Sequence, residues 1–160
     1  MEQTHLPAGY YAVPDPTTTD APTMTYWHVT YDDKGDRTVA PWPPKARYGP
    51  QPYKRDMPAD PAQRKTWFDG VVASRRTFWE QVDTAIQQDP AGCAARYAEF
   101  TTRCFDCGRS LRSDRWRLVG IGPDCFAKSG LNYTALASTT TPLIATAHAL
   151  HHAQRTGAAA

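Results

Sequence analysis

Three cysteines in the second half of the chain have the residue type and the spacing of a metal site. Cys104 and Cys107 form a Cys-x-x-Cys pair with Gly108 directly after it, and Cys125 follows Gly-Ile-Gly-Pro-Asp at positions 120–124. Two thiolates that are two residues apart can reach the same ion from one tight turn, and zinc binds four such ligands in a tetrahedron. We therefore expect one structural zinc ion, bound by Cys104, Cys107 and Cys125.

The spacing leaves the fourth ligand of this ion open, because no further cysteine or histidine directly follows Cys125. The candidates are Cys93, His148, His152, Asp124 and a water molecule. Cys93 would reach the ion only if the helix that carries it folds back over the Cys-x-x-Cys turn. The alternative is that Cys93 is a buried core residue and that the histidines between positions 148 and 152 lie at the surface.

A redox or catalytic use of these cysteines fits the sequence less well. A thioredoxin-like Cys-x-x-Cys follows a buried strand and opens a helix, whereas here a helix is expected before Cys104 and a basic segment after Cys107. No glutamate lies between Cys104 and Cys125 to act as a general base, and neither His-Glu-x-x-His nor His-x-Glu occurs. We therefore expect a protein that is not an enzyme and that has no small-molecule substrate.

The elements around the cysteines should form a treble-clef-like zinc knuckle. Gly108 permits the tight turn after the first pair, and residues 109–119 have the length of a short hairpin. Pro123 suits the first position of a short helix that carries Cys125 and ends at Gly130. Three apolar side chains are expected to cover the metal: Leu111, Trp116 and Leu118.

The N-terminal part of the chain predicts a small antiparallel β-sheet. Residues 9–13 and 24–31 are rich in β-branched and aromatic residues, 32–36 read as a turn, and 38–39 start a return strand. Residues 1–8 are expected to be frayed. The aromatic residues form either a base-stacking platform or the core and rim of the sheet, which is the favoured interpretation: Tyr10, Tyr11, Tyr26, Trp27 and Tyr31.

The middle and the end of the chain predict helices. Half of the fourteen prolines lie between positions 41 and 61, which indicates a linker or a long surface loop. Apolar residues from Trp67 to Ile86 follow helical spacing, in one helix or in two pieces of which 75–88 is the surer. Asp89-Pro90 starts a second helix that runs to Thr101, and a last helix is expected at 143–155 after a break at 139–142.

These elements together predict an α+β protein with an N-terminal sheet, a helical middle, a zinc knuckle and a C-terminal helix. The expected regions are 1–57, 58–102, 103–130 and 131–160. The formal net charge of +2 over 160 residues does not by itself indicate nucleic acid. No apolar run is long enough to span a membrane, and the N-terminus lacks the features of a secretory signal. We therefore expect a cytoplasmic location, where cysteines stay reduced.

The cysteine motifs also carry a resemblance to a known family. Two blocks, CFDCGRSL at 104–111 and GIGPDC at 120–125, resemble the pattern C-x-x-C-G-R-x-L … G-I-G-P-x-C of DUF6011, a zinc-finger-like family of unknown function known in actinobacteria and their phages. Residues 89–97 are similar to its lead-in helix, so the resemblance covers about 89–128. The usual serine before the second block is missing around 116–118, and the pattern does not require Cys93. The resemblance implies metal binding and DNA-handling neighbours, with no established reaction.

Two functions remain open. The first is an accessory protein that binds DNA or RNA, because basic residues alternate with aromatic ones around the knuckle, although zinc thiolates offset part of the charge. The residues expected at such a surface are Arg103, Arg109, Arg112, Arg115, Arg117, Trp116 and Lys128. The second is a protein-interaction adaptor, bacterial or phage-encoded, in which the zinc site is purely structural and the sheet and proline-rich loop contact the partner.

Overall fold

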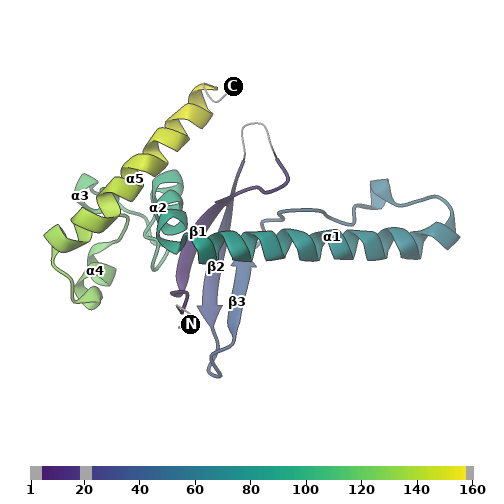
Figure 1. Ribbon diagram of the computed structural model, residues 1–160, viewed down its shortest axis with the longest axis horizontal. Coiled ribbons are helices and arrows are strands. Elements are labelled where there is room, and N and C mark those ends of the chain that lie inside the picture. Colours follow the sequence, from purple (N-terminus) through teal and green to yellow (C-terminus); the bar gives the residue numbers. More distant parts are fainter. Residues whose placement is uncertain (1–4, 19–22, 158–160) are drawn as a thin grey trace.

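The computed structural model describes residues 5–18 and 23–157 and shows an α+β protein built on a three-stranded antiparallel sheet (Figure 1). The strands are β1 (Gly9–Pro14), β2 (Met24–Tyr31) and β3 (Arg37–Pro41), in the order β1-β2-β3. The expected turn joins β2 to β3: the Asp32 carboxylate accepts the N–H groups of Lys34 and Asp36. The predicted sheet is confirmed, with β3 slightly longer than expected.

The aromatic residues of the sheet serve its core and rim rather than an exposed stacking platform. Tyr11 and Trp27 are buried, and the Trp27 indole N–H donates to Thr25 Oγ1 at 2.8 Å, whose hydroxyl donates to the carbonyl of Val13 at 2.7 Å. On the other face, Tyr10 is partly buried against Tyr97. This core-and-rim arrangement is the interpretation that the sequence favoured.

The proline-rich loop contributes Trp42 to the packing of this second face. Its indole lies edge-on to the rings of Tyr10, Tyr26 and Tyr97, at centroid distances between 5.4 and 6.3 Å. The Tyr48 hydroxyl donates to the Trp42 carbonyl at 2.8 Å, which folds the start of the loop back on itself. The loop is thus anchored to the sheet at one end.

Helix α1 (Pro61–Gln88) is one unbroken helix, so the alternative of two pieces is wrong. Asp60 caps it as predicted, accepting the N–H of Ala62 at 3.0 Å. Gly70 weakens a helix interior by only about 1 kcal/mol, and no proline interrupts the helix after its first residue. The C-terminal half packs on the sheet through three buried residues: Phe78, Val82 and Ile86.

The N-terminal half of α1 extends beyond the sheet, with the proline-rich loop running back alongside it (Figure 1). This loop includes the short 3-10 helix η1 (Lys54–Asp56). The Arg75 guanidinium fastens the loop to the helix, donating to the carbonyl of Pro50 at 3.2 Å and to Gln51 Oε1 at 2.7 Å. We call residues 45–77, which comprise loop and half-helix, the arm.

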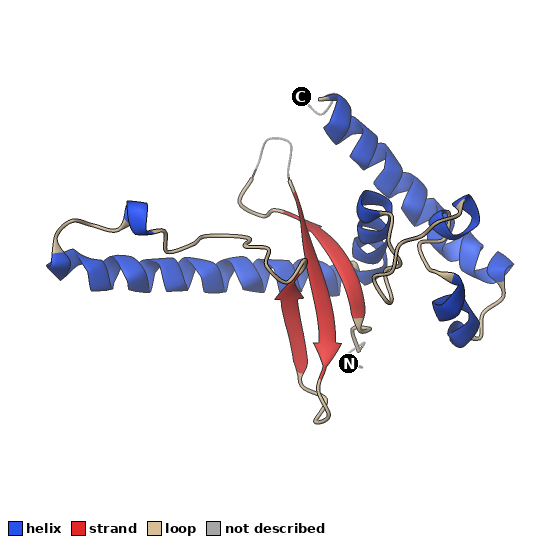
Figure 2. Cartoon of the chain, turned by 180° about the vertical axis from the view of Figure 1, so that it is seen from behind, coloured by secondary structure: helices blue, strands red, loops and turns tan. Residues whose placement is uncertain are grey.

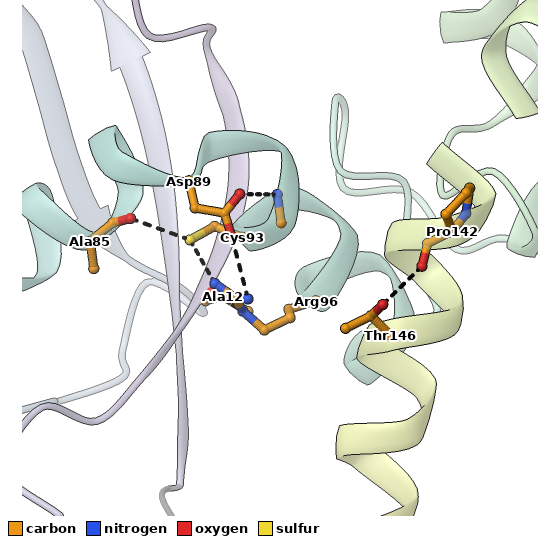
Figure 3. A network of polar contacts seen from close by, with 8 residues as sticks. Ala12, Ala85, Asp89, Cys93, Arg96, Pro142 and Thr146 are labelled. Carbon is orange, nitrogen blue, oxygen red and sulfur yellow. Dashed lines mark hydrogen bonds and ion pairs between the residues drawn. The ribbon is translucent and has the colours of Figure 1, made fainter. Parts of the chain in front are cut away.

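Helix α2 (Pro90–Thr101) is confirmed where it was expected and lies between the sheet and the C-terminal helix (Figure 2). Asp89 caps it by accepting the N–H of Gly92 at 3.0 Å, a contact visible in Figure 3. The helix ends at Thr102, whose φ of 54° turns the chain toward Cys104. Because α2 contacts β1 on one side and α5 on the other, it connects the two halves of the molecule.

The last helix, α5 (Tyr133–Thr156), starts ten residues before the expected one, so the predicted break at 139–142 is wrong. Asn132 caps it, accepting the N–H of Ala135 at 2.8 Å. Pro142 lies inside the helix, and the Thr146 hydroxyl donates to its carbonyl at 3.1 Å (Figure 3). Leu136 and Ile144 are buried on either side of the proline, so tertiary packing holds the helix together through it.

The residues just before β1 are packed against the sheet, contrary to the expected fraying. Leu6 is only 5% exposed, its carbonyl accepts the Tyr31 hydroxyl, and the Pro7 carbonyl accepts the Tyr11 hydroxyl. Residues 1–4, and the end of the tail at 158–160, lie outside the described residues. Among the helices in the described ranges, none is both long and apolar enough to cross a membrane.

Candidate metal centre

The chain brings Cys104, Cys107 and Cys125 together, with their sulfur atoms all within 4.8 Å of one another. In a tetrahedral site with Zn–S bonds of about 2.3 Å, two sulfur ligands are about 3.8 Å apart. The cluster is therefore of a size that a single metal ion fits. Cys104 and Cys125 are buried, whereas Cys107 is exposed and leaves one side open to solvent.

A tight turn gives the first two cysteines their shared direction. The Gly108 N–H donates to the Cys104 carbonyl and the Cys104 N–H donates to the Arg109 carbonyl, both at 2.8 Å. Gly108 has a φ of +75°, and a Cβ there would lie 2.8 Å from the Tyr10 ring. Glycine is required here for its left-handed backbone and also because β1 packs directly against the turn.

Backbone hydrogen bonds join this turn to the rest of the fold. The Phe105 carbonyl accepts the N–H of Tyr10 in β1 at 2.7 Å, and the Phe105 N–H donates to the Gly120 carbonyl at 3.0 Å. A Cβ on Gly9 would lie 2.8 Å from the Phe105 oxygen, so the backbone at Gly9 and the cysteine turn approach each other closely. The cysteine turn is therefore fixed both to the sheet and to the loop that leads to Cys125.

The segment between the cysteine blocks is not the hairpin that the sequence predicted. One isolated bridge pairs Arg103 with Ser110, and the chain then forms the short helix α3 (Asp114–Arg117). The helix turns Trp116 onto Phe126 and Tyr133, at centroid distances of 5.3 and 6.0 Å. Packing of this indole offers a physical reason for a helical turn where a strand was expected.

The apolar cover of the cluster differs from the expected one by one residue. Leu111 is buried and Trp116 packs against the same cluster, as predicted, but Leu118 is 52% exposed. Val119 and Ile121 are buried in its place. The short α3 shifts the apolar pattern by one position, so the residue after Leu118 faces inward.

The third cysteine lies on the helix that the sequence predicted. Helix α4 (Pro123–Ser129) has Pro123 at its first position and ends at Gly130, which has a φ of +70°. Cys125 faces inward from this helix and packs with Cys104, Leu111 and Leu136. The tight turn and the short helix that carries Cys125 are thus as expected.

The protonation of the cysteines is uneven when no cation is present. Burial raises the pKa of Cys125, and the Asp106 carboxylate and the neighbouring cysteines raise it further. For Cys107, burial acts to raise the pKa, but hydrogen bonds from the Arg109 N–H and from the thiols of Cys125 and Cys104 outweigh it, so the pKa is lowered. A cation bound between the sulfur atoms would favour the thiolate form of both groups.

Comparison with known proteins finds a family match over one segment of the chain. Residues 94–130 match the model of DUF6011, a family of unknown function. The resemblance seen in the cysteine motifs is thereby confirmed over the second half of α2, the turn, α3 and α4. No curated protein and no solved structure matches the chain.

The other cysteine and histidine candidates for a fourth ligand lie apart from the cluster of Cys104, Cys107 and Cys125. Cys93 is fully buried in the core beneath the sheet, where its sulfur accepts the Arg96 guanidinium at 3.1 Å and contacts the Ala85 carbonyl at 3.7 Å (Figure 3). His148 Nδ1 lies 2.6 Å from the Glu99 carboxylate. His151 stacks on Phe100, and His152 is exposed on the same helix.

Two aspartates lie close to the DUF6011 cysteines. Asp124 points outward and pairs with Arg109 at 3.2 Å. Asp106 lies between the two cysteines of the Cys-x-x-Cys motif, and its carboxylate raises the pKa of the Cys125 thiol. The cluster of possible ligand atoms within 4.8 Å of one another contains neither aspartate among the described residues.

We call residues 94–130 the DUF6011 segment. Most of its basic residues contact other groups of the protein. Arg103 donates to the Gly108 carbonyl at 2.9 Å and Arg117 to the Leu111 carbonyl at 3.0 Å. Arg115 lies over the Trp116 and Tyr133 rings. Arg112 and Lys128 are exposed. The basic side chains expected at a binding surface are therefore largely engaged with the protein itself.

A groove of about 930 Å³ lies beside the DUF6011 turn, which contributes Phe105 and Asp106 to its wall. The remaining wall comes from residues 5–8, the sheet, α2 and α5, and is mainly apolar. Its arginine, Arg37, is paired with Asp83 at 2.8 Å. The polar side chains of the wall also include His5, Gln87, Asp106 and Thr140.

Proposed function

We propose that this is a non-catalytic accessory protein in which one structural zinc ion, bound by Cys104, Cys107 and Cys125, stabilises a nucleic-acid-binding surface. The convergence of the three sulfur atoms within 4.8 Å carries the zinc proposal. Soft thiolate ligands favour zinc among the available cations. When bound, the ion supplies the charge that lets all three cysteines ionise.

A structural role follows from the position of the cluster. Its cysteines come from the turn after α2 and from α4, and Leu136 of α5 packs on them. The Tyr10–Phe105 hydrogen bond ties the same turn to β1. The metal would therefore connect four elements of the fold, and binding would be coupled to folding.

Native mass spectrometry of the full chain, with and without a chelator, tests the zinc proposal. The purified protein should carry one zinc ion. Chelation should remove this ion and cause the protein to unfold cooperatively. Cys104→Ser should lose the metal. The matched control is Cys93→Ser, which removes another buried thiol and should retain one zinc ion; a metal-free wild type that folds normally would end the proposal.

The identity of the fourth ligand needs a second experiment. We propose a water molecule, because the exposed Cys107 leaves one side of the cluster open to solvent and the described residues bring no carboxylate or imidazole within 4.8 Å of all three sulfur atoms. The alternative is the carboxylate of Asp106, which lies between the two cysteines of the motif in sequence. Asp106→Asn would weaken zinc affinity if the carboxylate binds the metal and would leave it unchanged if water does. Competition with a chromogenic chelator measures the difference.

Nucleic acid is proposed as the partner because of the basic residues around α3 and α4. Arg112 and Lys128 are both exposed, and the exposed Arg115 places its guanidinium over the partly buried aromatic pair Trp116 and Tyr133. Binding to phosphates should weaken steeply with salt. A gel shift with single- and double-stranded DNA and RNA at two salt concentrations, repeated with Arg112→Glu and Lys128→Glu together, is the test.

A second candidate is a protein-interaction adaptor in which the zinc site is purely structural. The bonding of Arg103 and Arg117 to backbone carbonyls favours it, because such arginines are not available to phosphates. The absence of any shifted band at low salt would select this function over the first.

A further inference from the structure

The arm, residues 45–77, carries a charge that the rest of the chain does not share. It contains eight lysines and arginines against three aspartates, a net charge of +5. The rest of the sequence contains ten basic against thirteen acidic residues, a net charge of −3. A protein of near-neutral total charge thus places its positive charge on one projecting element.

The basic side chains of the arm are open to solvent. Seven of the eight are exposed, and Arg75 is intermediate because it fastens the loop to the helix. The exposed ones are Lys45, Arg47, Lys54, Arg55, Arg64, Lys65 and Arg76. Some of them also have partners within the arm: Arg64 donates to the carbonyls of Pro58 and Ala59, and Lys65 pairs with Asp69 at 2.6 Å.

An apolar recess lies within this basic surface, between the proline-rich loop and α1. Tyr53, Phe68 and Val72 line it and are 43%, 49% and 40% exposed. They are three of the five large apolar residues that are exposed within the described part of the chain. The recess has a volume of about 310 Å³, with Arg47 and Arg75 at its rim, so it can accept one or two apolar side chains.

The charge and the recess together restrict the occupant. Pairing of two arms in a dimer would bring +5 against +5, which opposes association. The major groove of DNA is about 12 Å wide and admits a single helix, whereas here the loop adds a second layer to the helix. Phosphates also leave an apolar recess unfilled, while carboxylates satisfy the arginines and leave neighbouring apolar side chains free to insert.

We propose that the arm is a docking surface for an acidic segment of a partner protein, which inserts apolar side chains between Tyr53, Phe68 and Val72 and pairs its carboxylates with the surrounding lysines and arginines. The proposal gives a surface to the adaptor function described above and rests on that function. It does not depend on the zinc ion or on nucleic-acid binding by the DUF6011 segment.

Selection from a random 12-residue peptide library on the immobilised, full-length protein tests the proposal. Enriched peptides should combine aspartate or glutamate with leucine, phenylalanine or tryptophan. A fluorescein-labelled enriched peptide should bind the double variant Phe68→Ser, Val72→Ser at least 10-fold more weakly than the wild type. The matched control is Leu118→Ser, Leu131→Ser, which removes two equally exposed apolar side chains elsewhere and should bind normally.

A charge variant gives an independent readout, because its substitutions are at exposed positions. Arg47→Glu with Lys65→Glu should weaken binding of the same peptide, and raising the salt concentration from 50 to 300 mM should weaken the wild type. The proposal is overturned if no acidic peptide is enriched or if the Phe68, Val72 variant binds normally. It is equally overturned if that variant instead loses binding to a 20-base-pair DNA duplex or to phosphatidylserine vesicles. Zinc content and gel shifts measured on the same variants show separately whether the metal and nucleic-acid proposals stand.

Discussion

The DUF6011 segment and the arm look alike in sequence and differ in structure. Both combine several basic residues with aromatic ones. In the DUF6011 segment, Arg103 and Arg117 donate to backbone carbonyls and Arg109 pairs with Asp124. In the arm, Arg64 and Arg75 likewise donate to backbone carbonyls, but an apolar recess lined by Arg47 and Arg75 also stays open to solvent. The comparison teaches that a similar basic, aromatic composition can cover a buried cysteine cluster in one region and leave an apolar recess open to solvent in another.

Removing the metal should give the largest difference between the two regions. A structural zinc ion contributes on the order of 10 kcal/mol in small zinc domains, so chelation should abolish amide protection across 104–129. The arm, which contributes no cysteine, should keep its exchange pattern. Hydrogen exchange with and without chelator measures both; equal loss in the two regions would contradict the comparison.

Two phenylalanines on the same helix provide the next largest contrast. Phe78 is 1% exposed and packs with the sheet, so Phe78→Ala should destabilise the protein by about 3–5 kcal/mol. Phe68 in the arm is 49% exposed, and Phe68→Ala should change the free energy of unfolding by less than about 0.5 kcal/mol. Urea denaturation of both variants is the measurement. Similar losses would show that the arm is part of the core.

Two glycines should respond to alanine with opposite signs. Gly108→Ala should destabilise by roughly 1–3 kcal/mol, because φ is +75° and the new Cβ would lie 2.8 Å from the Tyr10 ring. Gly70→Ala should stabilise the helical arm by up to about 1 kcal/mol, since nothing lies within 4 Å of the new atom. Thermal unfolding reports the first and exchange at 61–77 the second. A stabilising Gly108→Ala would refute the close packing of the turn.

Two aspartate caps should give the smallest contrast. Asp89 and Asp60 each accept a backbone N–H at 3.0 Å at the start of a helix. Asp89→Ala should cost about 1 kcal/mol of global stability, because α2 lies between the sheet and α5. Asp60→Ala should fray the end of the arm and leave the unfolding midpoint nearly unchanged. Chemical denaturation combined with exchange separates the two outcomes.

Local signals were sufficient for the sheet, the helix caps and the cysteine turn. Asp60-Pro61 and Asp89-Pro90 start helices where expected, and Gly130 ends α4. These features depend on a residue and its near neighbours, which the sequence contains directly. The convergence of the three cysteines also followed from spacing alone.

Features that depend on distant partners could not be predicted in this way. The Thr-rich stretch before Pro142 looks like a break, yet burial of Leu136 and Ile144 keeps α5 continuous. Phe68 and Phe78 lie on one apolar stripe, but only the second has a sheet to pack on. The position of Cys93 likewise depends on how the chain folds, and the structure places it in the core beneath the sheet, apart from the other three cysteines.

The contact between Phe105 and β1 also bears on aggregation. β1 is an outer strand of the sheet, and two contacts occupy backbone groups on the edge that does not pair with β2. The Tyr10 N–H donates to the Phe105 carbonyl, and the Arg96 guanidinium donates to the Ala12 carbonyl at 3.4 Å. An uncovered strand edge can pair with other chains. If the proposed zinc ion holds the cysteine turn in place, its removal should release Phe105 from this edge and make self-association through β1 easier.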